Sequence, residues 1–121
     1  MFSLHVDTAR TWRGGQNQVL LTVLGLRARG HRTALVAHPN GELYRRASDS
    51  PDLIPIAVSG EVDFPAAWKL SRVLRAMRPT VIHAHDAHAV AMVALALPAS
   101  AQTTQTYCSG TPVMIPASGA T

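Results

Sequence analysis

The stretch FSLHVDTARTWRGGQNQVLLTVLGLRARGH, residues 2–31, decides the fold. Apolar residues dominate positions 2–6, which predicts a β-strand, and the polar loop that follows over 8–15 ends in two glycines. Apolar residues then recur at helical spacing, which predicts a helix over 16–29 with Gly30 as its carboxyl-terminal cap. A strand, a polar loop and an amphipathic helix in this order are typical of a parallel sheet with crossover helices.

The same alternation continues along the chain. Further strands are predicted over 33–38, 53–58 and 80–84, and further helices over 42–47, between a cap at Asp63 and a stop at Pro79, and over 87–97. Pro55 lacks the N–H group that a central strand needs, so the strand that contains it lies at an edge or starts after the proline. We therefore predict an α/β fold, a Rossmann-like parallel sheet of four or five strands with crossover helices, the fifth strand near 104–108.

The last part of the chain differs in composition from the rest. All 11 Lys and Arg residues and all seven Asp and Glu residues precede Pro98. This change divides the chain into an incomplete domain over 1–97 and an uncharged tail over 98–121, either disordered or out of register with the domain. A frame change or a premature end in the gene would produce such a tail.

Composition excludes several functional classes. The net charge of +4 is spread from Arg10 to Arg78 without clustering, so nucleic-acid binding is not indicated. Cys108 is the only cysteine, which excludes an internal disulfide and a CxxC metal site. The start of the chain lacks the pattern of a signal peptide, and the longest apolar run, 89–97, is far shorter than the roughly 20 residues of a membrane span. We expect a cytoplasmic protein that touches membranes at most peripherally.

The segment Arg13-Gly14-Gly15 is a candidate anion site. Free backbone N–H groups at the start of a helix favour negative charge, the glycines let a phosphate approach the backbone, and Arg13 adds a charge. The pattern is neither GxGxxG nor GxxxxGK[ST], so no dinucleotide fingerprint or P-loop is claimed. The alternative is that the two glycines only form a tight turn.

The stretch VIHAHDAHAV, residues 81–90, places three histidines beside one aspartate. It is similar to the HxHxDH pattern of metallo-β-lactamase-like hydrolases, although the aspartate stands one place too early, so His83, His85 and His88 are weighed as metal ligands. The stronger interpretation makes Asp86 the amino-terminal cap of a helix, His88 exposed in its first turn and His83 partly buried in a strand, with no metal bound. His85 then projects from a strand end into the crevice where open α/β sheets bind ligands, and is the candidate functional residue.

Taken together, the glycine pair, the helix that ends in RGH and the segment RPTVIHAHD, residues 78–86, resemble the amino-terminal half of a family 4 retaining glycosyltransferase of GT-B fold. The resemblance covers residues 1 to about 97. It implies two Rossmann-like domains that face each other across a cleft, the amino-terminal one holding the acceptor and the carboxyl-terminal one holding the nucleotide sugar.

The resemblance also implies roles for individual residues. Gly14 and Gly15 match the family's glycine loop, which approaches the phosphate of the donor and the acceptor. His85 matches a histidine that faces the transferred sugar, and Asp86 stands where many members have an acidic residue. The resemblance includes no donor-binding half, so we expect transfer from a nucleotide sugar to a sugar or lipid acceptor only if a separate donor domain is supplied, without a further cofactor.

Three other functions stay open. The first is a stand-alone module that binds anions or sugar phosphates through the RGG loop. The second is a metal-dependent hydrolase built on the three histidines of 81–90. The third is a non-functional remnant. The basic residues Lys69, Arg72 and Arg75 either touch an anionic membrane surface or form an ordinary solvated helix face.

Overall fold

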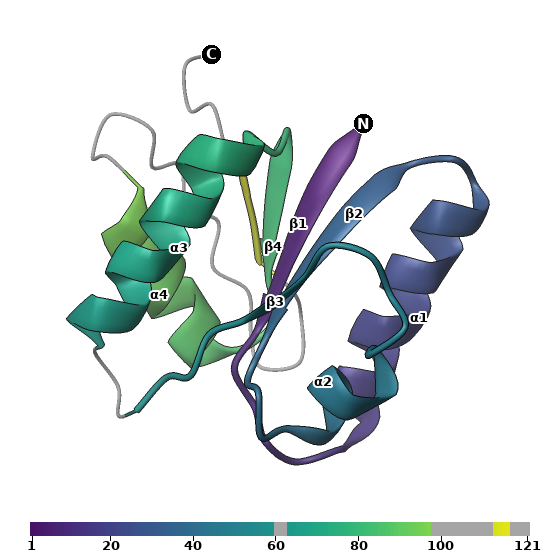
Figure 1. Ribbon diagram of the computed structural model, residues 1–121, viewed down its shortest axis with the longest axis horizontal. Helices are drawn as coiled ribbons and strands as arrows, with labels where there is room; N and C mark the ends of the chain where they lie inside the picture. Colours follow the sequence, from purple (N-terminus) through teal and green to yellow (C-terminus); the bar gives the residue numbers. More distant parts are fainter. Residues whose placement is uncertain (60–62, 98–112, 117–121) are drawn as a thin grey trace.

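The computed structural model describes residues 1–59 and 63–97 and the backbone of 113–116, and it places a sheet between two pairs of helices (Figure 1). The elements, in chain order, are β1 (Phe2–Asp7), α1 (Gly14–Ala28), β2 (Arg32–Ala37), α2 (Glu42–Arg46), β3 (Leu53–Pro55), α3 (Phe64–Met77), β4 (Val81–Ala84), α4 (Ala87–Ala96) and β5 (Val113–Pro116). This order confirms the predicted Rossmann-like alternation of strands and crossover helices.

The strands lie in the order β3-β2-β1-β4-β5. The first four are parallel, as predicted, whereas β5 runs antiparallel to β4, which was not predicted. The strand that contains Pro55 lies at the edge, as expected, but it ends at the proline, so a start after Pro55 is wrong. The strand expected near 104–108 lies outside the described residues, and the domain boundary at residue 97 stays a prediction.

Local sequence signals account for the helix ends. Helix α1 begins at Gly14, somewhat before the predicted residue 16, and Gly30 follows it with a φ of 85°, a conformation that favours glycine. The predicted caps of α3 and α4 are confirmed. Asp63 accepts a hydrogen bond from the N–H of Ala66, and Asp86 accepts one from the N–H of Ala89.

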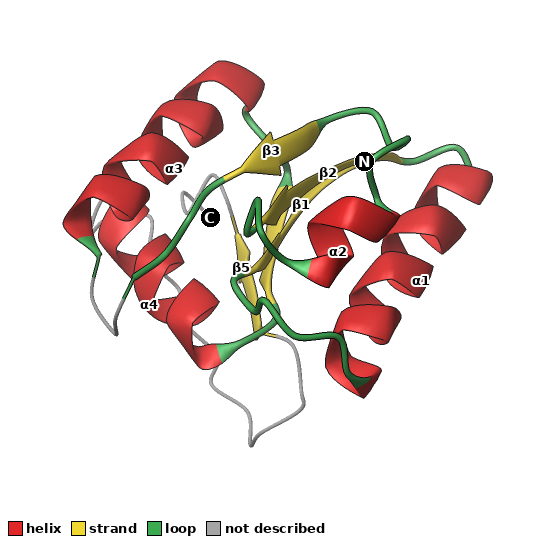
Figure 2. Cartoon of the chain, turned by 60° about the horizontal axis from the view of Figure 1, so that its bottom comes forward, coloured by secondary structure: helices red, strands yellow, loops and turns green. Residues whose placement is uncertain are grey.

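Two pairs of helices cover the two faces of the sheet (Figure 2). Helices α3 and α4 pack on the face that carries Leu4, Val6 and Ile82, and together they form the larger apolar core. On the other face, the side chains of α1 and α2 pack on those of β2 in a smaller apolar core. Because side chains alternate along a strand, Ser3, His5 and Asp7 of β1 face α1. None of the helices within the described ranges is long and apolar enough to cross a membrane.

Candidate functional site

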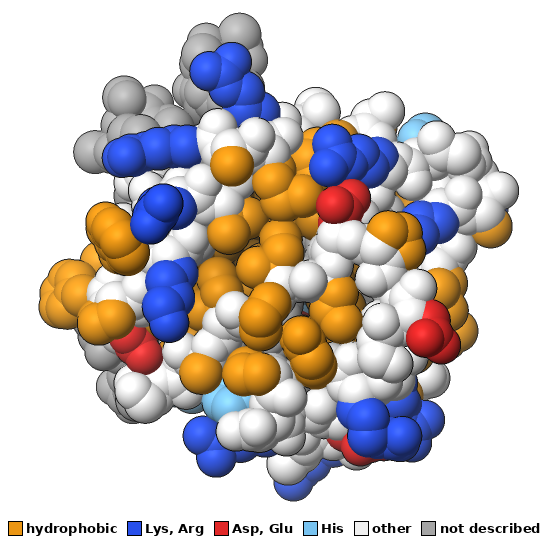
Figure 3. Space-filling model, in the orientation of Figure 1, with side chains coloured by type: hydrophobic (Ala, Val, Ile, Leu, Met, Phe, Trp, Pro, Cys, Tyr) orange, Lys and Arg blue, Asp and Glu red, His pale blue; other side chains and the backbone are white. Residues whose placement is uncertain are grey.

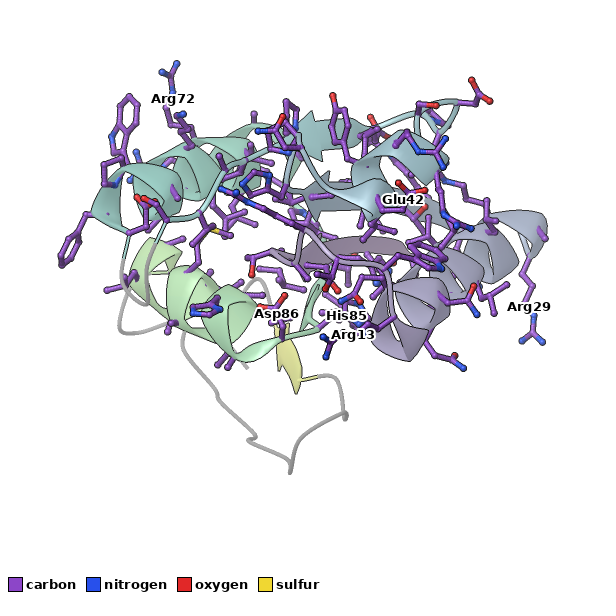
Figure 4. All side chains as sticks on the ribbon, turned by 90° about the horizontal axis from the view of Figure 1, so that it is seen from below. Arg13, Arg29, Glu42, Arg72, His85 and Asp86 are labelled. Carbon is purple, nitrogen blue, oxygen red and sulfur yellow. The ribbon has the colours of Figure 1, made fainter. Side chains whose placement is uncertain are left out.

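The predicted site residues gather where the parallel strands end. The loop after β1, the start of α1 and the start of α4 meet at this edge of the sheet. Figure 4 shows Arg13, His85 and Asp86 together there, between α4 and α1, whereas Arg29 and Arg72 point away from the molecule. The fold thus brings together the sequence-predicted residues of the glycine loop and of the histidine segment.

Asp86 connects α4 to the loop after β1. Its Oδ2 accepts the backbone N–H of Thr8 at 2.7 Å, and its Oδ1 accepts the Thr8 hydroxyl at 2.9 Å and the N–H of Ala89 at 2.7 Å. One carboxylate therefore caps the helix and fixes the position of the loop that leads to the glycines.

His85 follows directly on β4. Its backbone N–H donates to the carbonyl of Val6 at 2.9 Å, which continues the pairing of β4 with β1. Its side chain is half-buried, and Nε2 lies 3.0 Å from Nδ1 of His5. The side chain is thus held against His5, and its predicted contact with a ligand stays a prediction.

Three imidazoles lie together beside α1. His5, His83 and His85 each offer one ring nitrogen, and these nitrogens lie within 4.8 Å of one another. Burial lowers the pKa of His5 to about 3 and that of His85 to about 4, with a further contribution from the neighbouring imidazoles, and burial also lowers the pKa of His83. The three rings are therefore neutral at pH 7. His88, the third member of the set weighed from the sequence, is exposed on α4 and is not in this group.

The glycine loop is open to solvent. Arg13 is the residue before α1, and its backbone N–H donates to Oε1 of Gln16 at 3.1 Å. A side chain added at Gly14 or Gly15 would meet nothing within 4 Å. The fold itself therefore leaves space for a ligand beside the first turn of α1.

Asp7, at the end of β1, is a site residue that the sequence analysis missed. It is buried and accepts hydrogen bonds from the N–H of Ala9 at 2.9 Å and from the amide of Gln16 at 3.3 Å. Burial, together with the negative charge of the nearby Asp86, raises its pKa to about 6. A carboxyl group with a pKa near neutrality is suited to accept or donate a proton.

A pocket of about 430 Å³ opens at the same edge, lined by Thr8, Ala9, Val58, Asp86 and His88. Among the sequence-predicted site residues that the structure describes, Asp86 lines this pocket, whereas Arg13 and His85 do not. The pocket thus lies on the α4 side of the edge, and the glycine loop lies on the α1 side.

The signal that could have revealed the missed residues is the alternation in β1. Ser3, His5 and Asp7 occupy every second position of a strand that is otherwise apolar, so one face of a central strand is polar throughout. From the sequence, this run was predicted only as a β-strand. The contact of His5 with His85 depends on pairing across 80 residues of chain and has no local signal.

These features define an α/β domain with a candidate ligand site at the edge where the four parallel strands end. Residues 12–109 match the sequence profile of the family described as Glycosyltransferase Family 4. The match spans most of the chain, so the chain belongs to this family, which confirms the resemblance. Searches of curated proteins and of solved structures found no match.

Proposed function

We propose that the chain is the acceptor-side, amino-terminal domain of a retaining glycosyltransferase of GT-B fold. With a donor-binding domain supplied, it transfers a sugar from a nucleotide sugar to a sugar or lipid acceptor. The observation that carries the proposal is the family match over residues 12–109, together with the open glycine loop at the start of α1. A cytoplasmic location fits a nucleotide-sugar donor and stays a prediction.

The contacts at the edge of the sheet support distinct roles for its residues. The first turn of α1 offers backbone N–H groups to a phosphate, and Arg13 adds a positive charge. His85 is neutral, and because its Nε2 is engaged with His5, its Nδ1 is the atom that would hydrogen-bond the transferred sugar. Asp86 holds the loop after β1 in place. These roles align donor and acceptor rather than form a covalent bond.

The test mixes the 121-residue chain with the donor-binding domain of another family 4 enzyme and measures release of nucleoside diphosphate from UDP-sugars and GDP-sugars. Turnover should require both parts, and His85→Ala should lower it about 100-fold, as expected when a group that positions the substrate is lost. His31→Ala, outside the site, is the control. Turnover by the chain alone that His85→Ala abolishes would contradict the proposal.

A stand-alone anion-binding module is the second candidate, favoured by the exposed Arg13-Gly14-Gly15 segment. Calorimetry with UDP, GDP and simple sugar phosphates separates the two functions. Millimolar or tighter binding to the chain alone that is lost in Gly15→Val, with no turnover after a donor domain is added, would favour the module. A folded chain that neither binds these ligands nor supports turnover would favour a non-functional remnant.

We also propose that α3 contacts an anionic membrane surface, which suits a lipid acceptor. Phe64 and Trp68 are 68% and 61% exposed, and the Arg72 guanidinium lies 5.1 Å from the centre of the Trp68 ring. Figure 3 shows basic and apolar side chains next to each other over this helix. Exposed aromatic rings beside basic residues are typical of interfacial helices.

Co-sedimentation with vesicles tests this contact. Vesicles that contain phosphatidylglycerol should bind the chain, and Trp68→Ala should weaken the binding. Leu21→Ala is the matched control, because Leu21 is an exposed apolar residue on α1. Equal binding to vesicles of phosphatidylcholine alone, or equal loss in both variants, would contradict a specific role of α3.

A further inference from the structure

The polar side of β1 and β4 holds a second arrangement, a group of three histidines of which the proposed function assigns a ligand contact to His85 alone. His5 pairs directly with His83 in the parallel register of β1 and β4. His85 lies two residues further along the chain, so it projects to the same side as His83. The ring centroids are 4.9 Å apart for His5 and His83, 5.3 Å for His5 and His85, and 5.6 Å for His83 and His85. Pairing of two central strands thus makes three imidazoles converge.

Hydrogen bonds within the group leave one buried nitrogen without a partner among the described residues. His5 Nδ1 lies 3.0 Å from His85 Nε2, and His5 Nε2 lies 3.0 Å from the hydroxyl oxygen of Ser3. Among the described residues, Nδ1 of His83 is buried and has no hydrogen-bond partner. A buried nitrogen in this state is unfavourable, and a ligand at the centre of the group would offset its cost.

We infer that His5, His83 and His85 bind a divalent transition-metal ion, with Zn²⁺ as the reference ion. Neutral imidazole is a preferred ligand of zinc, copper and nickel. Around a tetrahedral zinc ion with nitrogens at roughly 2.0–2.1 Å, two ligand nitrogens lie about 3.4 Å apart. The observed donor atoms lie within 4.8 Å of one another, so small rotations of the rings bring them to this separation.

Ser3 supports one of the three metal ligands through a hydrogen bond. When Nδ1 of His5 binds the ion, Nε2 carries the proton and donates a hydrogen bond to the Ser3 hydroxyl oxygen, which fixes the tautomer and the orientation of the ring. The three protein ligands leave a fourth position for water or a substrate oxygen. The ion thus links β1 to His85, the residue between the end of β4 and Asp86. This inference does not depend on the glycosyltransferase proposal.

This site differs from the metal site considered from the sequence, which consisted of His83, His85 and His88. The difference supplies the control variant. His88 belongs to the sequence-based set but lies on α4, exposed and outside the cluster. His5 replaces it. His5→Gln and His88→Gln therefore separate the structural site from the local motif.

The experiment uses the full chain without a histidine tag, freed of metal with a chelator and dialysed against Zn²⁺. Metal analysis should find one ion per chain. His83→Gln or His5→Gln should weaken zinc binding by more than the roughly 10- to 100-fold that is typical when a residue that hydrogen-bonds a metal ligand is replaced. Ser3→Ala should weaken it within that range, and His88→Gln should leave it unchanged. Circular dichroism checks that each variant is folded.

A second measurement needs no variant. Co²⁺ added to the metal-free chain should give the intense visible absorption of a tetrahedral site, and Zn²⁺ should displace it. The inference is overturned if the folded chain retains no zinc, if His5→Gln binds as well as the unmodified chain, or if His88→Gln loses the ion. Weak octahedral Co²⁺ absorption would likewise overturn it.

Discussion

The side chains of β1 alternate between two faces of the sheet, and from Ser3 to Asp7 the two sets are both buried but differ in chemistry. Leu4 and Val6 face α3 and α4 inside the larger apolar core. Ser3, His5 and Asp7, each at most 1% exposed, face α1 and bond to polar partners. Burial of apolar groups stabilises the fold, whereas burial of polar groups costs free energy that hydrogen bonds only offset. The apolar face therefore accounts for stability, and the polar face carries the candidate chemistry.

The largest expected effect is on the apolar face. Leu70 of α3 is completely buried in that core, and Leu70→Ala should lower the free energy of unfolding by about 2–5 kcal/mol, because it removes apolar contacts and leaves a cavity. Urea denaturation measures the change. Ser3→Ala, equally buried on the polar face, is the matched control and should cost clearly less. Similar losses in both variants would break the comparison between the faces.

The second prediction concerns Asp7 and has the opposite sign. Its folded-state pKa is raised from 3.8 to about 6, so the ionised carboxylate destabilises the fold above pH 6, and this cost disappears as the pH falls towards 4. Asp7→Asn removes the charge and should stabilise the chain by about 1–3 kcal/mol at pH 8, since one pKa unit corresponds to about 1.4 kcal/mol.

Urea denaturation at pH 8, 6 and 4 in the presence of a chelator tests this. The difference in free energy of unfolding between Asp7→Asn and the unmodified chain should disappear at pH 4. Asp63→Asn is the control, because hydrogen bonds from the Ser59 and Ala66 backbone lower the pKa of that half-buried cap. A less stable Asp7→Asn variant at pH 8 would show that the carboxylate is needed in its charged form.

A smaller effect on stability is expected at Asp86, which joins the start of α4 to the loop after β1. Asp86→Ala removes the cap of α4 and both bonds to Thr8, and should cost about 0.5–2 kcal/mol, the usual range for a lost cap. Thermal unfolding measures it, and Asp63→Ala is the matched cap on α3. Hydrogen exchange at Thr8 should rise in Asp86→Ala alone. Unchanged exchange there would show that the loop after β1 is held by other contacts.

The helix caps and the site differ in how far they could be predicted from the sequence. Asp63, Asp86 and Gly30 act on backbone within a few residues, so local sequence was enough to predict them. His5 belongs to the histidine group only because β1 and β4 are neighbours in register, and a residue in the apolar run of β1 gives no local sign of that partner. Asp7 is similar, since its raised pKa comes from burial and from Asp86, far away in the chain.

The smallest effect on stability separates structural from functional glycines. Gly41 is needed for packing, because a Cβ there would lie 2.9 Å from the carbonyl oxygen of Ala9. Gly15, in the first turn of α1, meets nothing within 4 Å, so Gly15→Ala should stabilise the chain by at most about 1 kcal/mol through reduced freedom of the unfolded chain. If thermal unfolding shows this gain while phosphate-ligand binding falls, the glycine serves the ligand. Lower stability in Gly15→Ala would instead assign it to the fold.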